Sequence, residues 1–163
     1  MKRATRAGFT LVEIMIVVAI IALLAAIAIP NVLRGRTTAN ESASIGNLRA
    51  LLSSLEMYRS VYQAYPGSST VQSDMYTVPT PDYGPPSFDR PLDGSNPGSV
   101  VQGYKYTYAS GSADVYTLNA DPVTTNTGSR AFFVSQEGLI RHCSGASGAA
   151  STDRTIDQPP DNC

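Results

Sequence analysis

A single carboxylate, Glu13, interrupts a long apolar run near the N-terminus. The apolar segment from Phe9 to Ile29 is long enough to span a bilayer as a helix. A carboxylate at membrane depth is costly unless it takes up a proton or meets a cation. The chemistry expected of Glu13 is therefore the formation of an ion pair with a nearby amine or another cation.

The residues before the apolar run indicate where that cation comes from. Residues 1–8 contain no acid and three basic residues, Lys2, Arg3 and Arg6. This charge pattern is typical of a cytoplasmic flank. The apolar run ends at Pro30 without the small-residue cleavage pattern of a secretory signal peptide. Cleavage between Gly8 and Phe9 would instead create an α-amine on Phe9, about one helical turn from Glu13. We predict that Glu13 pairs with this amine, in its own chain or a neighbour's, and so fixes the register between chains.

The same residues resemble a known signal. The run Gly8-Phe9-Thr10-Leu11-Val12-Glu13, followed by an apolar helix and Pro30, resembles the class III signal of type IV pilins and type II secretion pseudopilins. The resemblance implies that a prepilin peptidase cleaves after Gly8 and that Phe9 becomes an N-methylated N-terminus. It also implies that Glu13 contacts the Phe9 amine of an adjacent subunit in a helical filament.

The two cysteines define the C-terminal segment, residues 143–163. Cys143 and Cys163 follow the membrane segment, which places them in an oxidising compartment, where a cysteine pair in a small domain is expected to form a disulfide. The resemblance offers two interpretations of the loop that this bond would close. Many type IV pilins have a disulfide-bounded loop here, whereas major type II pseudopilins commonly have an acidic calcium-binding loop. We expect no metal, because the candidate ligands lack the spacing of a loop-type calcium site: Asp153, Asp157 and Asp161.

We expect neither catalysis nor a cofactor. His142 is the sole histidine and precedes Cys143, but adjacent residues on a strand point to opposite faces and cannot share a proton. The sequence contains no P-loop, no Gly-x-Ser-x-Gly motif and no metal-spaced Cys/His cluster. Removal of the leader would leave nine basic against thirteen acidic residues, so nucleic acid is not indicated as a partner.

Residues 30–65 read as an amphipathic continuation of the apolar helix. Apolar residues recur there at spacings of three and four, which predicts one buried stripe. The stripe consists of Ile45, Leu48, Leu51, Leu52, Leu55, Tyr58 and Tyr62. The charged residues of this segment fall mostly outside this stripe: Glu41, Arg49, Glu56 and Arg59.

The composition changes at residues 66–100, which contain seven of the eleven prolines. Proline and glycine at this density predict a surface connection between helix and sheet. Residues 101–142 then predict an antiparallel sheet, with strands at 104–108, 115–118, 131–134 and 139–142. A turn is expected at Ser110-Gly111-Ser112.

Three alternating tyrosines mark the first of these strands: Tyr104, Tyr106 and Tyr108. We interpret this row as core, with an interface stripe as the alternative. The predicted fold is α+β and pilin-like, a long N-terminal helix packed on a three- or four-stranded antiparallel sheet.

Together with these patterns, the resemblance to type IV pilins implies a structural subunit of a type IV pilus-like filament. The alternatives are a pseudopilin of a type II secretion system and a plain membrane-anchored periplasmic domain. The expected partners are copies of the chain itself, a prepilin peptidase, an inner-membrane assembly platform and minor pilins. The precursor is expected in the inner membrane with its leader in the cytoplasm, and the assembled filament in the periplasm or outside the cell.

Overall fold

The computed structural model describes most of the chain. The described residues are 9–77, 82–89, 92–94, 98–145, 149–150, 153–156 and 161–162. The chain divides into two units, Met1–Gly35 and Arg36–Cys163, each considered by itself below, and the second unit is called the head. The expected leader, residues 1–8, lies outside the described residues.

A single long helix, α1 (Leu11–Tyr62), supplies the described part of the first unit and continues into the head. It passes through Pro30, as expected, and ends three residues before the predicted boundary at residue 65. Within residues 9–35 no described residue is buried, and all except Ala25 are exposed. Among the described residues of this unit, nothing therefore buries the apolar half of α1.

The head consists of the rest of α1, two short helical turns and one sheet. The turns are η1 (Ser73–Thr77) and η2 (Pro86–Phe88). The strands are β1 (Val100–Val101), β2 (Tyr104–Ser112), β3 (Val115–Pro122), β4 (Arg130–Ser135), β5 (Ile140–Ser144), β6 (Arg154–Thr155) and β7 (Asp161–Asn162). Strands β1 to β6 are antiparallel neighbours in sequence order, and β7 pairs with β5 in parallel. The predicted α+β fold is confirmed, with more strands than expected.

The four predicted strands correspond to β2 to β5, but the first hairpin turn lies further along the chain. Ser110 and Ser112 belong to β2, with a register irregularity between them, and the connection to β3 is Ala113–Asp114. The expected turn at residues 110–112 is therefore wrong. A bulge at Gly111 lets β2 continue where the glycine signal predicted its end.

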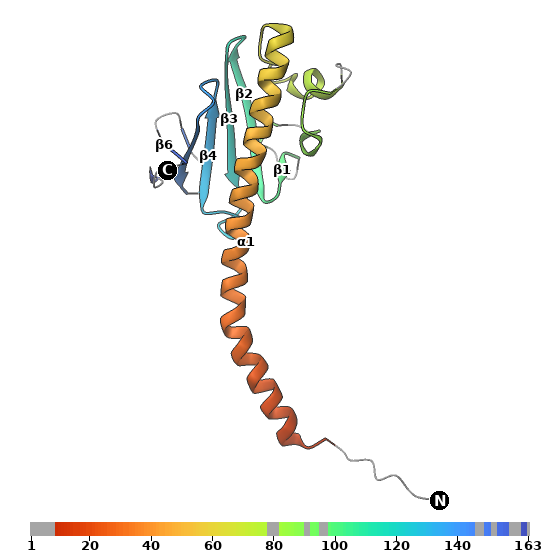
Figure 1. Cartoon of the computed structure of the whole chain (residues 1–163), viewed down its shortest axis with the longest axis vertical. Coiled ribbons are helices and arrows are strands. Elements are labelled where there is room, and N and C mark those ends of the chain that lie inside the picture. Colours follow the sequence, from red (N-terminus) through yellow and green to blue (C-terminus); the bar gives the residue numbers. More distant parts are fainter. Residues whose placement is uncertain are drawn as a thin grey trace, which may run out of the picture. The chain divides into compact units, whose positions relative to one another are not determined.

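The core lies between α1 and one face of the sheet, where the second half of α1 runs along the strands (Figure 1). Leu48, Leu51 and Leu55 are at most 1% exposed, and Ile45, Leu52 and Tyr58 are partly buried against the same core, which confirms these six positions of the predicted stripe. The seventh, Tyr62, is wrong as a core residue, because it is 48% exposed near the end of α1. The three tyrosines of β2 are also buried. Their hydroxyls bond to Arg130 O, Ser44 Oγ and Pro66 O. The tyrosine row is therefore core, and its polar ends are satisfied inside the unit.

The proline-rich segment is more than a surface connection. Met75 in η1 and Phe88 in η2 are fully buried, and Phe88 packs edge-on against Tyr106 with ring centroids 4.7 Å apart. These two apolar residues thus attach the segment to the core, although its overall composition predicts a loop. Leu92 adds a third anchor just before β1.

A tight turn joins β1 to β2. Gln102 and Gly103 have φ angles of 50° and 80°, the pattern of a two-residue hairpin loop that requires positive φ at both central positions. A Cβ at Gly103 would lie 2.9 Å from Thr127 Cβ and 3.2 Å from Asn40 Nδ2. Glycine at 103 therefore serves both the backbone conformation and the close approach of α1.

Candidate functional site

Glu13 closes the first turn of α1. The amide and the hydroxyl of Thr10 both donate to Glu13 Oε2 at 2.8 Å. In return, the Glu13 amide donates to Thr10 Oγ1 at 3.2 Å. Thr10 immediately precedes the helix, so the two residues form a reciprocal capping box. This role of Thr10 is a feature that the sequence-based predictions above do not include, although the Thr-x-x-Glu spacing is its signal.

The expected partner of Glu13 lies next to this capping box. Phe9 is 83% exposed, and Gly8 lies outside the described residues. In the full-length chain the Phe9 nitrogen belongs to a peptide bond. The pairing of Glu13 with a free Phe9 amine therefore stays a prediction, as do cleavage and methylation. The capping box bonds the Glu13 carboxylate to the amide of Thr10. Thr10 is the residue next to Phe9, where the free amine would form.

The apolar half of α1 presents a continuous exposed surface. Within the described residues, α1 is the one helix long and apolar enough to cross a membrane. No residue in its most apolar stretch is buried. Such a surface marks contact with lipid or with another protein. Phe9 extends this surface just before the helix, and the large side chains of α1 in it are Leu11, Val12, Ile14, Met15, Ile16, Val17, Val18, Ile20, Ile21, Leu23, Leu24, Ile27, Ile29, Val32 and Leu33.

In the head a buried ion pair ties α1 to the sheet. Arg130 of β4 binds Glu41 Oε2 through Nη2 at 2.8 Å and through Nε at 2.9 Å. The amide and the hydroxyl of Ser129 donate to Glu41 Oε1, each at 2.8 Å. Burial alone raises the pKa of Glu41, but the hydrogen bonds from Ser129 and the contact with Arg130 outweigh burial and hold this pKa below its ordinary value.

Glu41 corrects an expectation from the sequence. It is counted among the charged residues that fall mostly outside the apolar stripe, but its exposed fraction is 6%. The signal was present, since Glu41 precedes Leu48 by seven residues and Leu55 by fourteen, which puts all three on one helix face. The charge of Glu41 argued against burial, and its partner Arg130 is too distant in the sequence to be recognised from local spacing.

His142 and Cys143 lie on opposite faces of β5, as the strand geometry predicts. His142 Nδ1 lies 3.2 Å from Arg130 Nη1, and its ring stacks on Phe132 with centroids 6.4 Å apart. Cys143 packs on the other face with Ala131, Phe133 and Ala149. The two side chains therefore cannot form a catalytic dyad.

The C-terminal candidates are described only in part. Cys143 is buried and is not a free thiol, but Cys163 lies outside the described residues, so their pairing stays a prediction. Asp153 Oδ2 accepts a hydrogen bond from the Ala150 amide at 2.6 Å. Asp157 and the side chain of Asp161 lie outside the described residues. Among the residues that are described, no three His, Cys, Asp or Glu side chains gather as a metal site.

Comparisons with known proteins agree with this geometry. Residues 3–29 match the family model of the prokaryotic N-terminal methylation motif. The chain is 32% identical over 127 residues to the type II secretion system core protein G of Pseudomonas aeruginosa, a match that covers 74% of this chain and 88% of the relative. The chain therefore belongs to the family of type IV pilins and type II secretion pseudopilins.

Two further relatives show the breadth of that family. The type II secretion system core protein G of Vibrio cholerae is 30% identical over 130 residues, 74% of this chain and 84% of the relative. The type IV wide pilus major component PilA4 of Thermus thermophilus is 38% identical over 74 residues, 45% of this chain and 56% of the relative. No solved structure matches the chain.

Proposed function

We propose that this chain is a pseudopilin, a filament subunit of a type II secretion system that polymerises through the apolar half of α1. One observation carries the proposal: residues 9–33 form an apolar segment, helical from Leu11, with a single carboxylate at its start, and none of its side chains is buried by the described residues of its unit. Such a helix requires lipid in the monomer and neighbouring copies in a filament. Moving between these surroundings exchanges one apolar environment for another.

The choice of secretion over a pilus rests on the extent of the similarity. The core protein G relatives of Pseudomonas and Vibrio are matched over 88% and 84% of their length. The wide-pilus component is matched over 56% of its length. The pseudopilin interpretation, an alternative from the sequence alone, is therefore the better supported one.

Several partners follow from this proposal. A prepilin peptidase would cleave after Gly8 and methylate Phe9. An inner-membrane assembly platform would then receive the mature subunit, and minor pseudopilins would join the same filament. The precursor would sit in the inner membrane with residues 1–8 in the cytoplasm, and the head would lie in the periplasm. The proposal includes a structural rather than a catalytic role, and it is supported by the placement of His142 and Cys143 on opposite faces of β5.

The test is a chromosomal deletion of the gene, scored for two outputs. We expect the secreted fraction of type II substrate proteins to collapse and pilus-dependent surface motility to stay normal. Expression of the wild-type chain should restore secretion. A Gly8→Leu chain, which retains the leader because a side chain obstructs cleavage, should not restore it. Normal secretion together with lost motility would instead establish the pilus function.

A further inference from the structure

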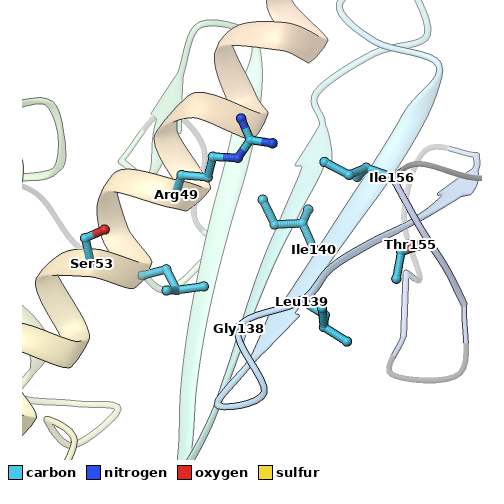
Figure 2. Close-up of a pocket in the computed structure, with 8 residues that line it drawn as sticks. Arg49, Ser53, Gly138, Leu139, Ile140, Thr155 and Ile156 are labelled. Carbon is cyan, nitrogen blue, oxygen red and sulfur yellow. The ribbon is translucent and has the colours of Figure 1, made fainter.

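The head contains a cavity that has no part in the proposed assembly through the apolar half of α1. It has a volume of about 570 Å³ and lies between α1 and the β5–β6 end of the sheet (Figure 2). Apolar side chains from both sides line it: Leu52, Leu139, Ile140 and Ile156. Leu139 is 47% exposed, so the rim is open to another molecule.

One cation, Arg49, stands at this cavity. In the head, the arginines Arg59, Arg130 and Arg141 each pair with a carboxylate. Among the described residues, Arg49 forms no hydrogen bond or ion pair, and it is exposed. A cavity of this kind fits an apolar group that has a carboxylate a few ångströms away.

The chain itself presents such a group on η2. Pro86 and Asp89 are exposed, whereas Phe88 between them is fully buried and fixes the turn against Tyr106. Side chains three residues apart eclipse each other in a 3₁₀ turn. Pro86 begins η2 and Asp89 is its C-cap, so the two lie on one side of the turn. They present an apolar ring beside a carboxylate that forms no ion pair within the described part of the chain.

The cavity and η2 lie on opposite sides of α1. Arg49 and Tyr58 are nine residues apart, two and a half helical turns, so they point in opposite directions. Tyr58 contacts Tyr83, which shortly precedes η2, with ring centroids 5.7 Å apart. η2 lies at the β2 end of the sheet, through Phe88 and Tyr106, and the cavity lies at the β5–β6 end. One head therefore cannot fill its own cavity with its own η2.

We propose that the cavity receives η2 of a second copy of this chain, with Pro86 among the apolar side chains and Asp89 paired with Arg49. Two different, complementary surfaces on opposite sides of one subunit make a heterologous contact. Repetition of such a contact produces an open helical array when the rotation does not close. The inference rests on the proposed filament function and names a head-to-head contact within it.

Charge exchange tests this contact in the full-length chain, expressed with its assembly machinery. We expect Arg49→Asp and Asp89→Arg, each alone, to lower the sheared filament yield by about tenfold, because like charges would face each other across the interface. The double variant restores opposite charges and should recover most of the yield. Processed subunit in the membrane should stay constant in all three variants.

Cysteine cross-linking supplies a second readout that does not depend on yield. Leu139→Cys and Ser87→Cys chains, co-expressed and assembled, should form a disulfide-linked dimer of this chain. The matched control pairs Ser87→Cys with Val115→Cys, which is comparably exposed but lies at the β2–β3 turn. That pair should give no dimer.

The outcomes separate the contact from the filament. Wild-type yield from Arg49→Asp, or filaments without the Leu139–Ser87 cross-link, would overturn the contact and leave the filament function standing. Capture of a different protein by Leu139→Cys would also overturn it. A wild-type chain that forms no filaments with its machinery present would refute the proposed function itself.

Discussion

Glu41 and Arg130 show how one residue pair determines where the helix meets the sheet. Glu41 is the first buried residue of α1, and both of its carboxylate oxygens are occupied by Ser129 and Arg130. Asn40 adds a 2.9 Å bond to the Thr127 carbonyl beside this pair. A charge buried with all its bonds satisfied restricts the helix to one docking position on the sheet.

Replacement of Glu41 by glutamine should destabilise the head by up to about 3 kcal/mol, because Arg130 would remain largely buried without its counter-charge. The cost is limited by the 28% of the Arg130 side chain that stays exposed. Urea unfolding of the full-length chain in detergent, followed by tyrosine fluorescence, measures this difference.

The same variant has a defined pH signature. The folded-state pKa of Glu41 is lowered from 4.5, so its stabilising contribution is present above pH 4.5 and is lost as the pH falls through the folded-state value. We expect the wild-type chain to lose stability on acidification below pH 4.5 more steeply than Glu41→Gln. Parallel curves for the two proteins would show that Glu41 is not held in its charged form.

The hydroxyl of Tyr106 offers a second residue-scale test. It donates to Ser44 Oγ at 3.1 Å and accepts from Asn47 Nδ2 at 3.2 Å, with Ser44 fully buried. Tyr106→Phe should cost about 1–3 kcal/mol, because it leaves buried polar atoms unsatisfied. Tyr62→Phe is the matched control, since this tyrosine is half exposed, and its effect should stay within about 0.5 kcal/mol. Equal losses of stability in the two variants would contradict the role given to the Tyr106 hydroxyl.

At the scale of elements, the periodic spacing of apolar residues is the signal that predicted the buried helix face and the first long strand. The spacing of Leu48, Leu51 and Leu55 predicted the buried face of α1, and the alternation of tyrosines predicted β2, since both patterns repeat over several turns or residues. The turn after β2 was misplaced, because Gly111 signals a turn but is absorbed in a bulge. The anchors Met75 and Phe88 are single residues in a polar context, so no period reveals them.

The hairpin between β1 and β2 depends on Gly103 for two reasons. Gly103→Ala should therefore destabilise the head more than Gly138→Ala, by at least about 1 kcal/mol. Gly138 has a φ angle of 75°, but a Cβ at that position would meet no atom within 4 Å, so alanine there encounters backbone strain alone. Thermal unfolding of both variants makes the comparison. A cost at Gly138 equal to that at Gly103 would show that the approach of Asn40 and Thr127 is unimportant.

For the whole molecule, the sequence predicts assembly residues from a local motif, and their role stays a prediction, whereas the contacts that hold the head together are not visible in it. Phe9 and Glu13 stand in a dense local motif, so their placement required no tertiary contact. The pairs that hold the head together, such as Glu41 with Arg130, are separated by 89 positions. Nothing in a single sequence reports which distant charges meet.

Loss of the Glu13 carboxylate should affect assembly and spare insertion. Glu13→Ala makes the segment more apolar, so the processed subunit should accumulate in the membrane at least as well as wild type. Filaments should fall sharply, because the predicted ion pair between Glu13 and the Phe9 amine could no longer form. Filament yield in sheared fractions, relative to total processed subunit, is the measurement.

Glu13→Gln separates charge from helix capping. Glutamine can still accept the hydrogen bonds from Thr10 but cannot pair electrostatically with a Phe9 amine. We expect it to assemble as poorly as Glu13→Ala. Normal filaments from the glutamine variant would mean that Glu13 acts through the capping box with Thr10.

The position of Arg130 within the sheet has a mechanical consequence. Strand β4 is bonded to β3 on one side and to β5 on the other, so it is an interior strand. A pull applied to α1 near Glu41 would pass through the ion pair into the middle of the sheet and load two ladders of backbone hydrogen bonds at once. Ladders loaded together resist tearing better than an edge strand, which can be peeled off one bond at a time.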